Sequence, residues 1–122
     1  MRVAVIGASK DRSKFGNKAV RAYLSEGHTV FPVNPREREI EGLRCYGSVL
    51  EIPGDIDIAL LYVPPSAGLK VLGEIAKRGI KKVYFNPGTE SPELEKKARE
   101  LGLEPIFGCA IRAVGLSPSN FP

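Results

Sequence analysis

The chain has 122 residues, of which 43% are hydrophobic and 26% charged, and its net charge at pH 7 is +4. This length suits one domain with a buried core, and the positive residues are too scattered for the basic stripe of a nucleic-acid-binding protein. No apolar run reaches the roughly 18 to 20 residues of a membrane-spanning helix, so we expect no membrane partner. Lys10, Asp11 and Arg12 follow the first apolar run too closely for a secretory signal, which predicts a cytoplasmic protein.

Short apolar runs alternate with helical periods along the chain. Val3 to Ile6 are apolar in succession, which is typical of a strand buried on both faces. By this criterion, strands are expected over residues 2–7, 28–33, 57–63, 82–85 and 104–107. The helical spacing of Phe15, Ala19 and Tyr23 predicts a helix from Lys14 to Ser25, with Ser13 as its N-cap and Gly27 as its stop.

Two further helices are expected after the third and fourth strands. Pro64 to Ser66 introduce the first, which ends at Gly79, and Ser91 is the N-cap of the second, which ends at Gly102. Residues 36–54 are expected to form a loop with a short turn near Leu50. The tail, residues 108–122, shows no clear pattern, and its prolines argue against a long final helix.

This order of elements predicts a single-domain α/β protein over residues 1–122. The fold class is a Rossmann-like, doubly wound parallel sheet of about five strands. In such sheets, ligands bind outside the carboxyl ends of the strands, near the point where the strand order reverses. The turns that follow the strands should therefore share one rim, and this rim is where we expect a binding site.

The first of these turns runs from Gly7 to Gly16 and is rich in basic and hydroxyl residues. A glycine after the strand lets the backbone turn sharply, and its amides can approach a pyrophosphate at the helix N-terminus. Ser9 and Ser13 add hydroxyl groups, and the turn also carries positive charge on Lys10, Arg12 and Lys14. A plain surface turn with solvated charges is the alternative interpretation.

The second strand ends in Asn34-Pro35-Arg36 and not in the acidic residue that would hold the ribose of NAD. The first turn also lacks the G-x-G-x-x-G pattern, so NAD is not expected. Arg36 could contact an additional ribose phosphate, which NADP carries at the 2′ position and coenzyme A (CoA) at the 3′ position. Arg36 by itself is compatible with both NADP and CoA, whereas the first turn argues against NADP.

The next two turns offer an apolar wall and further polar groups. Val63-Pro64-Pro65-Ser66 lacks amide donors at its prolines and suits an adenine ring or a pantetheine arm. It could equally be a rigid lead-in to a helix. Asn86-Pro87-Gly88 follows the fourth strand and brings polar groups to the same rim, although by itself it is an ordinary turn.

The two cysteines, Cys45 and Cys109, form neither a disulfide framework nor a metal-binding pattern. Cys109 follows the fifth strand, so thiol exchange with a bound thiol is conceivable. No histidine or carboxylate can be named to activate it, and His28 begins a strand, where a structural role is expected. A packing role for Cys109 is therefore the favoured interpretation.

Taken together, these turns resemble the CoA-binding domain family, whose fold also forms the N-terminal domain of the succinyl-CoA synthetase alpha subunit. The resemblance covers almost the whole chain. The most specific part combines Gly7-Ala8-Ser9 with Val33-Asn34-Pro35. Further matching segments are Asp11–Ser13, Ile40–Gly42, Cys45–Ser48, Ile52-Pro53, Ile56–Ala59, Val63-Pro64, Gly88, Gly102-Leu103 and Cys109.

The resemblance implies a position for each part of CoA. The turn from Gly7 to Ser13 would take the phosphates, and Asn34, Pro35 and Arg36 would lie against the adenosine. Val63 and Pro64 would line the other side, and Asn86 and Gly88 would close the rim. The binding residues expected on these grounds are Gly7, Ala8, Ser9, Arg12, Ser13, Lys14, Asn34, Pro35, Arg36, Val63, Pro64, Asn86 and Gly88.

Two segments depart from the family pattern. Many small members have a glutamine before the glycine turn of the fourth strand, where this chain has Asn86-Pro87. Phe107-Gly108 replaces the familiar acidic and basic residues before the cysteine. In the synthetase, phosphoryl transfer depends on a histidine of a second domain, which His28 does not match, so that activity is not expected here.

We therefore expect a module that binds CoA or an acyl-CoA, alone or as a subunit with a protein partner or a second copy of itself. No catalytic residue and no metal site are assigned, and no activity of its own is expected. The alternatives are an NADP-dependent oxidoreductase, a CoA-thiol exchange enzyme that uses Cys109, and a purely structural partner domain.

Overall fold

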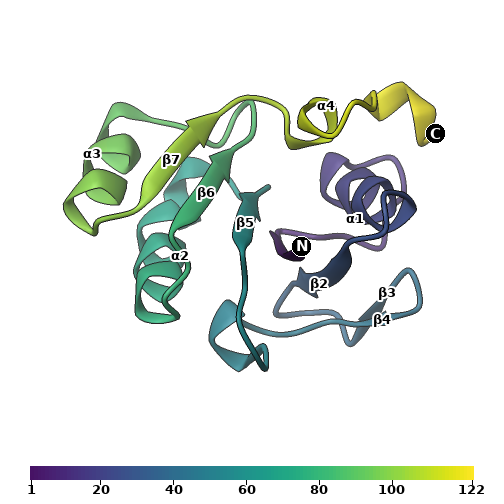
Figure 1. Cartoon of the computed structure of the whole chain (residues 1–122), viewed down its shortest axis with the longest axis horizontal. Helices are drawn as coiled ribbons and strands as arrows, with labels where there is room; N and C mark the ends of the chain where they lie inside the picture. Colours follow the sequence, from purple (N-terminus) through teal and green to yellow (C-terminus); the bar gives the residue numbers. More distant parts are fainter.

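Five parallel strands form one sheet through the middle of the molecule in a computed structural model that describes all 122 residues (Figure 1). Their order in the sheet is β2-β1-β5-β6-β7. The chain leaves β1 toward β2 on one side and then crosses over to β5 on the other side. The order thus reverses at β1, which places the expected binding crevice outside the carboxyl ends of β1 and β5. The strands are β1 Arg2–Ile6, β2 Thr29–Val33, β5 Ile58–Leu61, β6 Lys82–Phe85 and β7 Glu104–Phe107.

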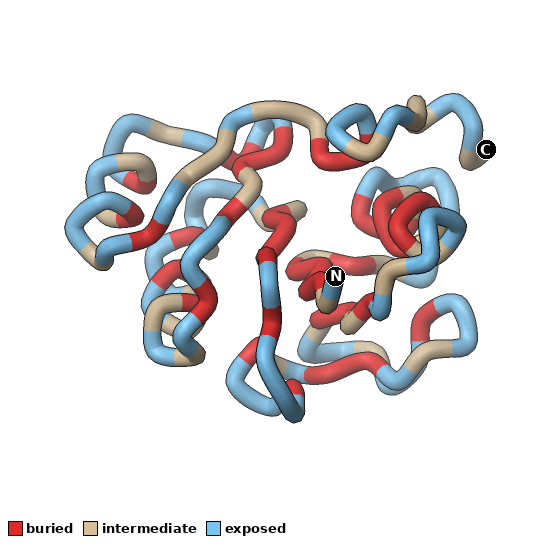
Figure 2. Tube along the Cα trace, in the orientation of Figure 1, coloured by how far each residue is buried: buried red, intermediate tan, exposed pale blue.

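Helices cover both faces of this sheet, as a doubly wound fold requires. Helices α1 (Phe15–Ser25) and α4 (Ala110–Ala113) pack on one face. Helices α2 (Pro65–Lys77) and α3 (Pro92–Glu100) pack on the other. Consecutive residues of β1 belong alternately to the two cores, because successive side chains of a strand point to opposite faces. Figure 2 shows the resulting buried trace through β1 and β5.

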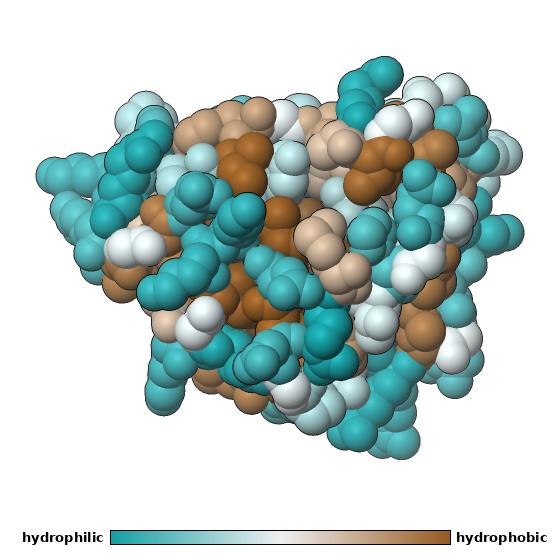
Figure 3. Space-filling model, in the orientation of Figure 1, coloured by the Kyte–Doolittle hydropathy of each residue, from teal (hydrophilic) through white to brown (hydrophobic).

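One part of the α1 face has no helix over it. A groove of about 510 Å³ lies there, and its lining includes Tyr84 of β6 and Ile106 of β7. In the space-filling view, apolar side chains gather near the middle of the molecule, with hydrophilic side chains around them (Figure 3). None of the helices has the length and apolar content needed to cross a membrane.

The predicted single-domain α/β class and the five-stranded parallel sheet are confirmed. Residues 82–85 and 104–107 form strands with the predicted limits, and Ser91 caps α3 by accepting a hydrogen bond from the amide of Leu94 at 3.1 Å. The third strand is shorter than predicted and ends at Leu61.

The predicted N-cap of the first helix is wrong. Lys14, not Ser13, occupies the N-cap position of α1, and a lysine side chain has no acceptor with which to cap the helix amides. The Ser13 hydroxyl lies one residue earlier and donates to Asp11. The helix therefore begins with its first amides uncapped, which matters for the site described below.

The segment 36–54 is more ordered than the predicted loop. Strands β3 (Glu39–Ile40) and β4 (Leu43–Arg44) form a small hairpin, and its two turn residues have positive φ angles of 50° at Glu41 and 77° at Gly42. A 3-10 turn over Val49–Glu51 follows, where a turn was predicted near Leu50. The tail adds α4 and a second 3-10 turn, Pro118–Asn120.

Candidate functional site

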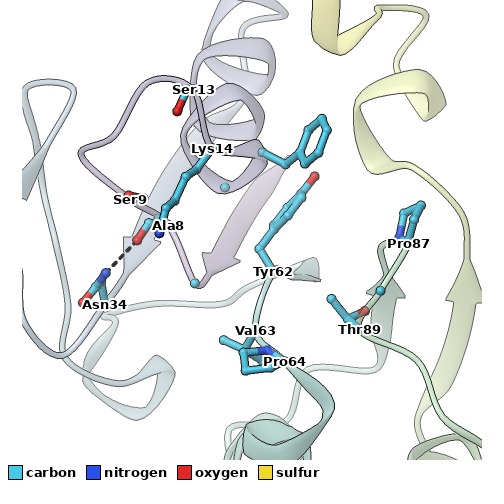
Figure 4. A pocket seen from close by; sticks show the side chains of 14 residues that line it. Ala8, Ser9, Ser13, Lys14, Asn34, Tyr62, Val63, Pro64, Pro87 and Thr89 are labelled. Carbon is cyan, nitrogen blue, oxygen red and sulfur yellow. Dashed lines mark hydrogen bonds between the residues drawn. The ribbon is translucent and has the colours of Figure 1, made fainter.

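A cleft of about 560 Å³, here called the main cleft, lies at the carboxyl ends of β1 and β5 (Figure 4). It occupies the point where the strand order reverses, and it brings together residues from all four turns considered above. Nine of the predicted binding residues line it, namely Gly7, Ala8, Ser9, Ser13, Lys14, Asn34, Val63, Pro64 and Gly88. The others in its lining are Phe15, Gly16, Tyr62, Pro87 and Thr89.

The first turn is packed so closely that only glycine fits at two positions. Gly7 has a φ angle of +92°, and a Cβ there would lie 2.5 Å from the carbonyl oxygen of Tyr62. A Cβ on Gly16 would collide with the carbonyl oxygen of Gly7. This close approach sets the start of α1 directly against the end of β1.

The start of α1 presents free amide groups to the main cleft. Asn17 and Lys18 donate their amides to the carbonyl oxygen of Lys14, whereas Phe15 and Gly16 have no acceptor inside the helix. Phe15 and Gly16 both line the main cleft. A helix N-terminus of this kind attracts anions through its free N–H groups and the positive end of the helix dipole.

Hydrogen bonds inside the turn hold its shape. The Asp11 carboxylate accepts the Ser13 hydroxyl at 2.6 Å and the Ser13 amide at 3.0 Å, and the Ser9 hydroxyl oxygen accepts the Asp11 amide at 3.0 Å. The Ser13 hydroxyl and amide lower the pKa of Asp11 below its ordinary value of 3.8. The Ser13 hydroxyl proton is thus already used in a hydrogen bond within the turn. The Ser9 hydroxyl acts there only as an acceptor, so its proton can be donated to a ligand.

This network predicts a pH-dependent contribution of Asp11 to stability. Because the pKa of Asp11 is depressed on folding, its stabilisation is present above about pH 3.8 and is lost as the pH falls through the folded pKa. The melting temperature of Asp11→Ala should lie below that of the wild type above this pH and converge with it at lower pH. Asp55→Ala, at an exposed carboxylate, is the matched control and should show no such convergence. Parallel curves for Asp11→Ala would contradict the role given to Asp11.

The end of β2 is tied to the first turn by Asn34. Its side-chain amide donates to the Ala8 carbonyl oxygen at 2.8 Å, the dashed line in Figure 4, and its oxygen accepts the Arg36 amide at 2.9 Å. Pro35 and Arg36 line a second cleft of about 720 Å³. This second cleft also contains Lys70 and shares with the main cleft the residues Gly7, Asn34, Tyr62, Val63 and Pro64.

The first turn has three basic residues, and only one of them, Lys14, both lines the main cleft and forms no salt bridge. Lys10 pairs with Glu37 at 3.1 Å and Arg12 with Glu41 at 3.5 Å. Arg12 is the one predicted binding residue that lines none of the clefts described here, and its side chain is 61% exposed. The hairpin that carries Glu41 therefore draws Arg12 away from the main cleft.

Asn86 is buried, and its side chain bonds to backbone at both ends. Its amide group donates to the Leu61 carbonyl oxygen at 2.9 Å, and its oxygen accepts the Ala110 amide at 2.9 Å. These bonds connect the end of β5 to the start of α4. The Asn86 side chain therefore has a structural role, and it is not the free polar group that was expected at the rim.

Tyr62 is a lining residue that sequence reasoning missed, because it lies in the segment predicted as the third strand. Its hydroxyl is buried and has no hydrogen-bond partner in the protein. Leaving such a group unpaired costs about 1–3 kcal/mol. Burial raises the pKa of Tyr62, so the hydroxyl stays protonated and is available as a donor.

A third cavity, of about 240 Å³, opens beside the main cleft and is lined by Cys109 and Asn86 among others. No aspartate or glutamate lines it. The only histidine, His28, lies just before β2, where its ring nitrogen is 2.9 Å from the N-terminal amine. Cys109 thus has neither an imidazole nor a carboxylate within its cavity to activate its thiol.

Comparisons with known proteins show the family to which the chain belongs. A family model described as a CoA binding domain matches residues 1–113. The ADP-forming acetate–CoA ligase of Methanocaldococcus jannaschii is 39% identical over 103 residues, which cover 81% of this chain and 15% of that ligase. The alpha subunit of ADP-forming acetate–CoA ligase II from Pyrococcus furiosus is 38% identical over 106 residues, which cover 81% of this chain and 23% of that subunit.

The chain thus spans less than a quarter of the length of these two relatives. A solved structure of a conserved hypothetical protein from Pyrococcus furiosus matches over most of both molecules. It is 44% identical, with a TM-score of 0.87, and the match covers 92% of this chain and 97% of that protein. With a family model that matches nearly all of its residues, the chain belongs to the CoA-binding domain family.

Proposed function

We propose that the protein binds CoA, or an acyl-CoA, across the carboxyl ends of its parallel strands. The observation that carries this proposal is the main cleft itself, where uncapped amides of α1 and the unpaired Lys14 face the point of strand reversal. The pyrophosphate would accept hydrogen bonds from the amides of Phe15 and Gly16 and from the Ser9 hydroxyl. Lys14 would supply the positive charge.

The adenosine part would occupy the second cleft, which continues from the main cleft past Asn34. Arg36 and Lys70 both line this second cleft, and together they suit the 3′-phosphate that distinguishes CoA from dephospho-CoA. Val63 and Pro64 lie between the two clefts and offer an apolar wall for the adenine ring.

The test is a calorimetric titration of nucleotide-free protein with CoA, dephospho-CoA, NADP and NAD. CoA is expected to bind about 10- to 100-fold more tightly than dephospho-CoA, the effect of charge-assisted hydrogen bonds to one phosphate. In Arg36→Ala this preference should shrink, whereas Arg38→Ala, at an exposed arginine outside the clefts, should keep it. A preference for NADP would favour an oxidoreductase, and no binding at all would leave a structural partner domain.

We further propose that the protein works as a binding module together with a protein partner. The supporting observation is that relatives named as ligases, one of them a subunit, contain a matching segment within much longer chains. No catalytic residue is assigned, because Cys109 has no activating group beside it. The cytoplasmic location stays a prediction.

A further inference from the structure

The third cavity is a continuation of the main cleft. The two share Phe15, Tyr62 and Pro87, and the third cavity extends from there toward Ile111 of α4 and Pro118 of the tail. Its volume of about 240 Å³ lies below the roughly 300 to 1,000 Å³ of pockets for drug-sized ligands. A small, mainly apolar group attached to a ligand in the main cleft would fit this space.

Tyr62 lines both the main cleft and the third cavity, and the direction of its side chain shows where its hydroxyl lies. In Figure 4 its ring reaches away from Val63 and Pro64, with the hydroxyl at the far end. The adenosine is proposed to lie against Val63 and Pro64, so the hydroxyl lies on the side left for the other end of CoA. This hydroxyl is a protonated donor that finds no acceptor in the protein.

We propose that the third cavity receives the acyl group of a short-chain acyl-CoA and that the Tyr62 hydroxyl donates a hydrogen bond to the thioester carbonyl. This inference rests on the proposed binding of CoA. The carbonyl oxygen supplies the acceptor that Tyr62 lacks, and the alkyl chain contacts Ile111 and Pro118. Free CoA ends in a thiol, so it has neither the carbonyl oxygen that would bond to Tyr62 nor the alkyl chain that would fill the third cavity.

The other polar groups of the cavity do not compete for this role. Asn86 already bonds to Leu61 and Ala110 through both ends of its amide. Arg112 is the only charged residue in the lining, and it is exposed, so its guanidinium remains hydrated. The Tyr62 hydroxyl is shielded from solvent, so a side chain of the lining has to move before a ligand can reach it. Phe15 lines both cavities and is 59% exposed, so its ring can turn aside without loss of core packing.

The experiment compares the dissociation constants of CoA and butyryl-CoA by calorimetry. In the wild type, butyryl-CoA should bind about tenfold more tightly or better, because its alkyl carbons leave water. Tyr62→Phe keeps the ring but removes the donor, and it should lower this affinity ratio about fivefold, the effect of one neutral hydrogen bond. Tyr84→Phe, in the uncovered groove outside the third cavity, is the matched control and should leave the ratio unchanged.

A second variant tests the volume of the cavity. Cys109→Leu adds carbon atoms to the lining, so it should reduce the affinity for butyryl-CoA more than the affinity for acetyl-CoA. Equal affinity of the wild type for CoA and butyryl-CoA, or an unchanged ratio in Tyr62→Phe, would overturn the inference while CoA binding stands. Absence of binding by both ligands would instead overturn the proposed function, and this inference with it.

Discussion

Replacing Gly7 with alanine is expected to lower the free energy of unfolding by about 2–4 kcal/mol. Part of this cost is conformational, because the φ angle of +92° is unfavourable for any residue with a Cβ. The rest is steric, since the new Cβ would lie 2.5 Å from the Tyr62 carbonyl oxygen and 3.0 Å from a methyl group of Val63. Unfolding in guanidinium chloride, followed by circular dichroism, measures the change.

Gly73→Ala is the matched control for this substitution. Gly73 lies in α2, is exposed, and has no atom within 4 Å of an added Cβ. Alanine is the better helix former, so this variant should be more stable than the wild type by about 0.5–1 kcal/mol. If Gly7→Ala unfolded at the same denaturant concentration as the wild type, the close approach of β1 and β5 at this turn would be contradicted.

Removing the Lys14 side chain is expected to weaken CoA binding about 10- to 100-fold. Lys14 lines the main cleft, and no carboxylate lies within salt-bridge distance of it. Its charge is therefore available to the phosphates. Calorimetric titration of Lys14→Ala with CoA measures the loss, and higher salt should reduce the difference from the wild type.

Arg12→Ala provides the comparison within the same turn. Arg12 lies two residues from Lys14 but pairs with Glu41 and lines none of the clefts. Its removal should change the affinity for CoA only about threefold or less, as expected for an exposed ion pair. A larger loss in Arg12→Ala than in Lys14→Ala would show that the phosphates lie on the hairpin side of the turn.

The main elements of the fold could be predicted because their signals are local. β1 and β5 are continuous apolar runs, and α3 begins with Ser91-Pro92, whose preferences for the first helical positions act through adjacent atoms. The hairpin of β3 and β4 could not be predicted in this way. Each of its strands has two residues, which is too short to show the alternation of a strand.

The sequence was enough to predict where the candidate site lies but not which of its side chains point into it. The position follows from topology, since turns after parallel strands share one edge of the sheet. The directions depend on partners far along the chain. Arg12 turns to Glu41 of the hairpin, and Asn86 turns to Leu61 and Ala110. In the sequence, Tyr62 looks like one more residue of an apolar strand. The structure shows that its hydroxyl is buried without a hydrogen-bond partner.

Local sequence patterns are enough to predict the α/β class, the elements with strong periodicity, and the glycine that the first turn requires. Each of these depends on forces between neighbours in the chain, such as the steric limits on φ and the burial of consecutive apolar residues. Tertiary contacts, in contrast, set which charged side chain faces the main cleft and which polar side chains already have hydrogen-bond partners. Those outcomes depend on hydrogen bonds and ion pairs between residues 24 to 29 positions apart in the chain, which no local pattern encodes.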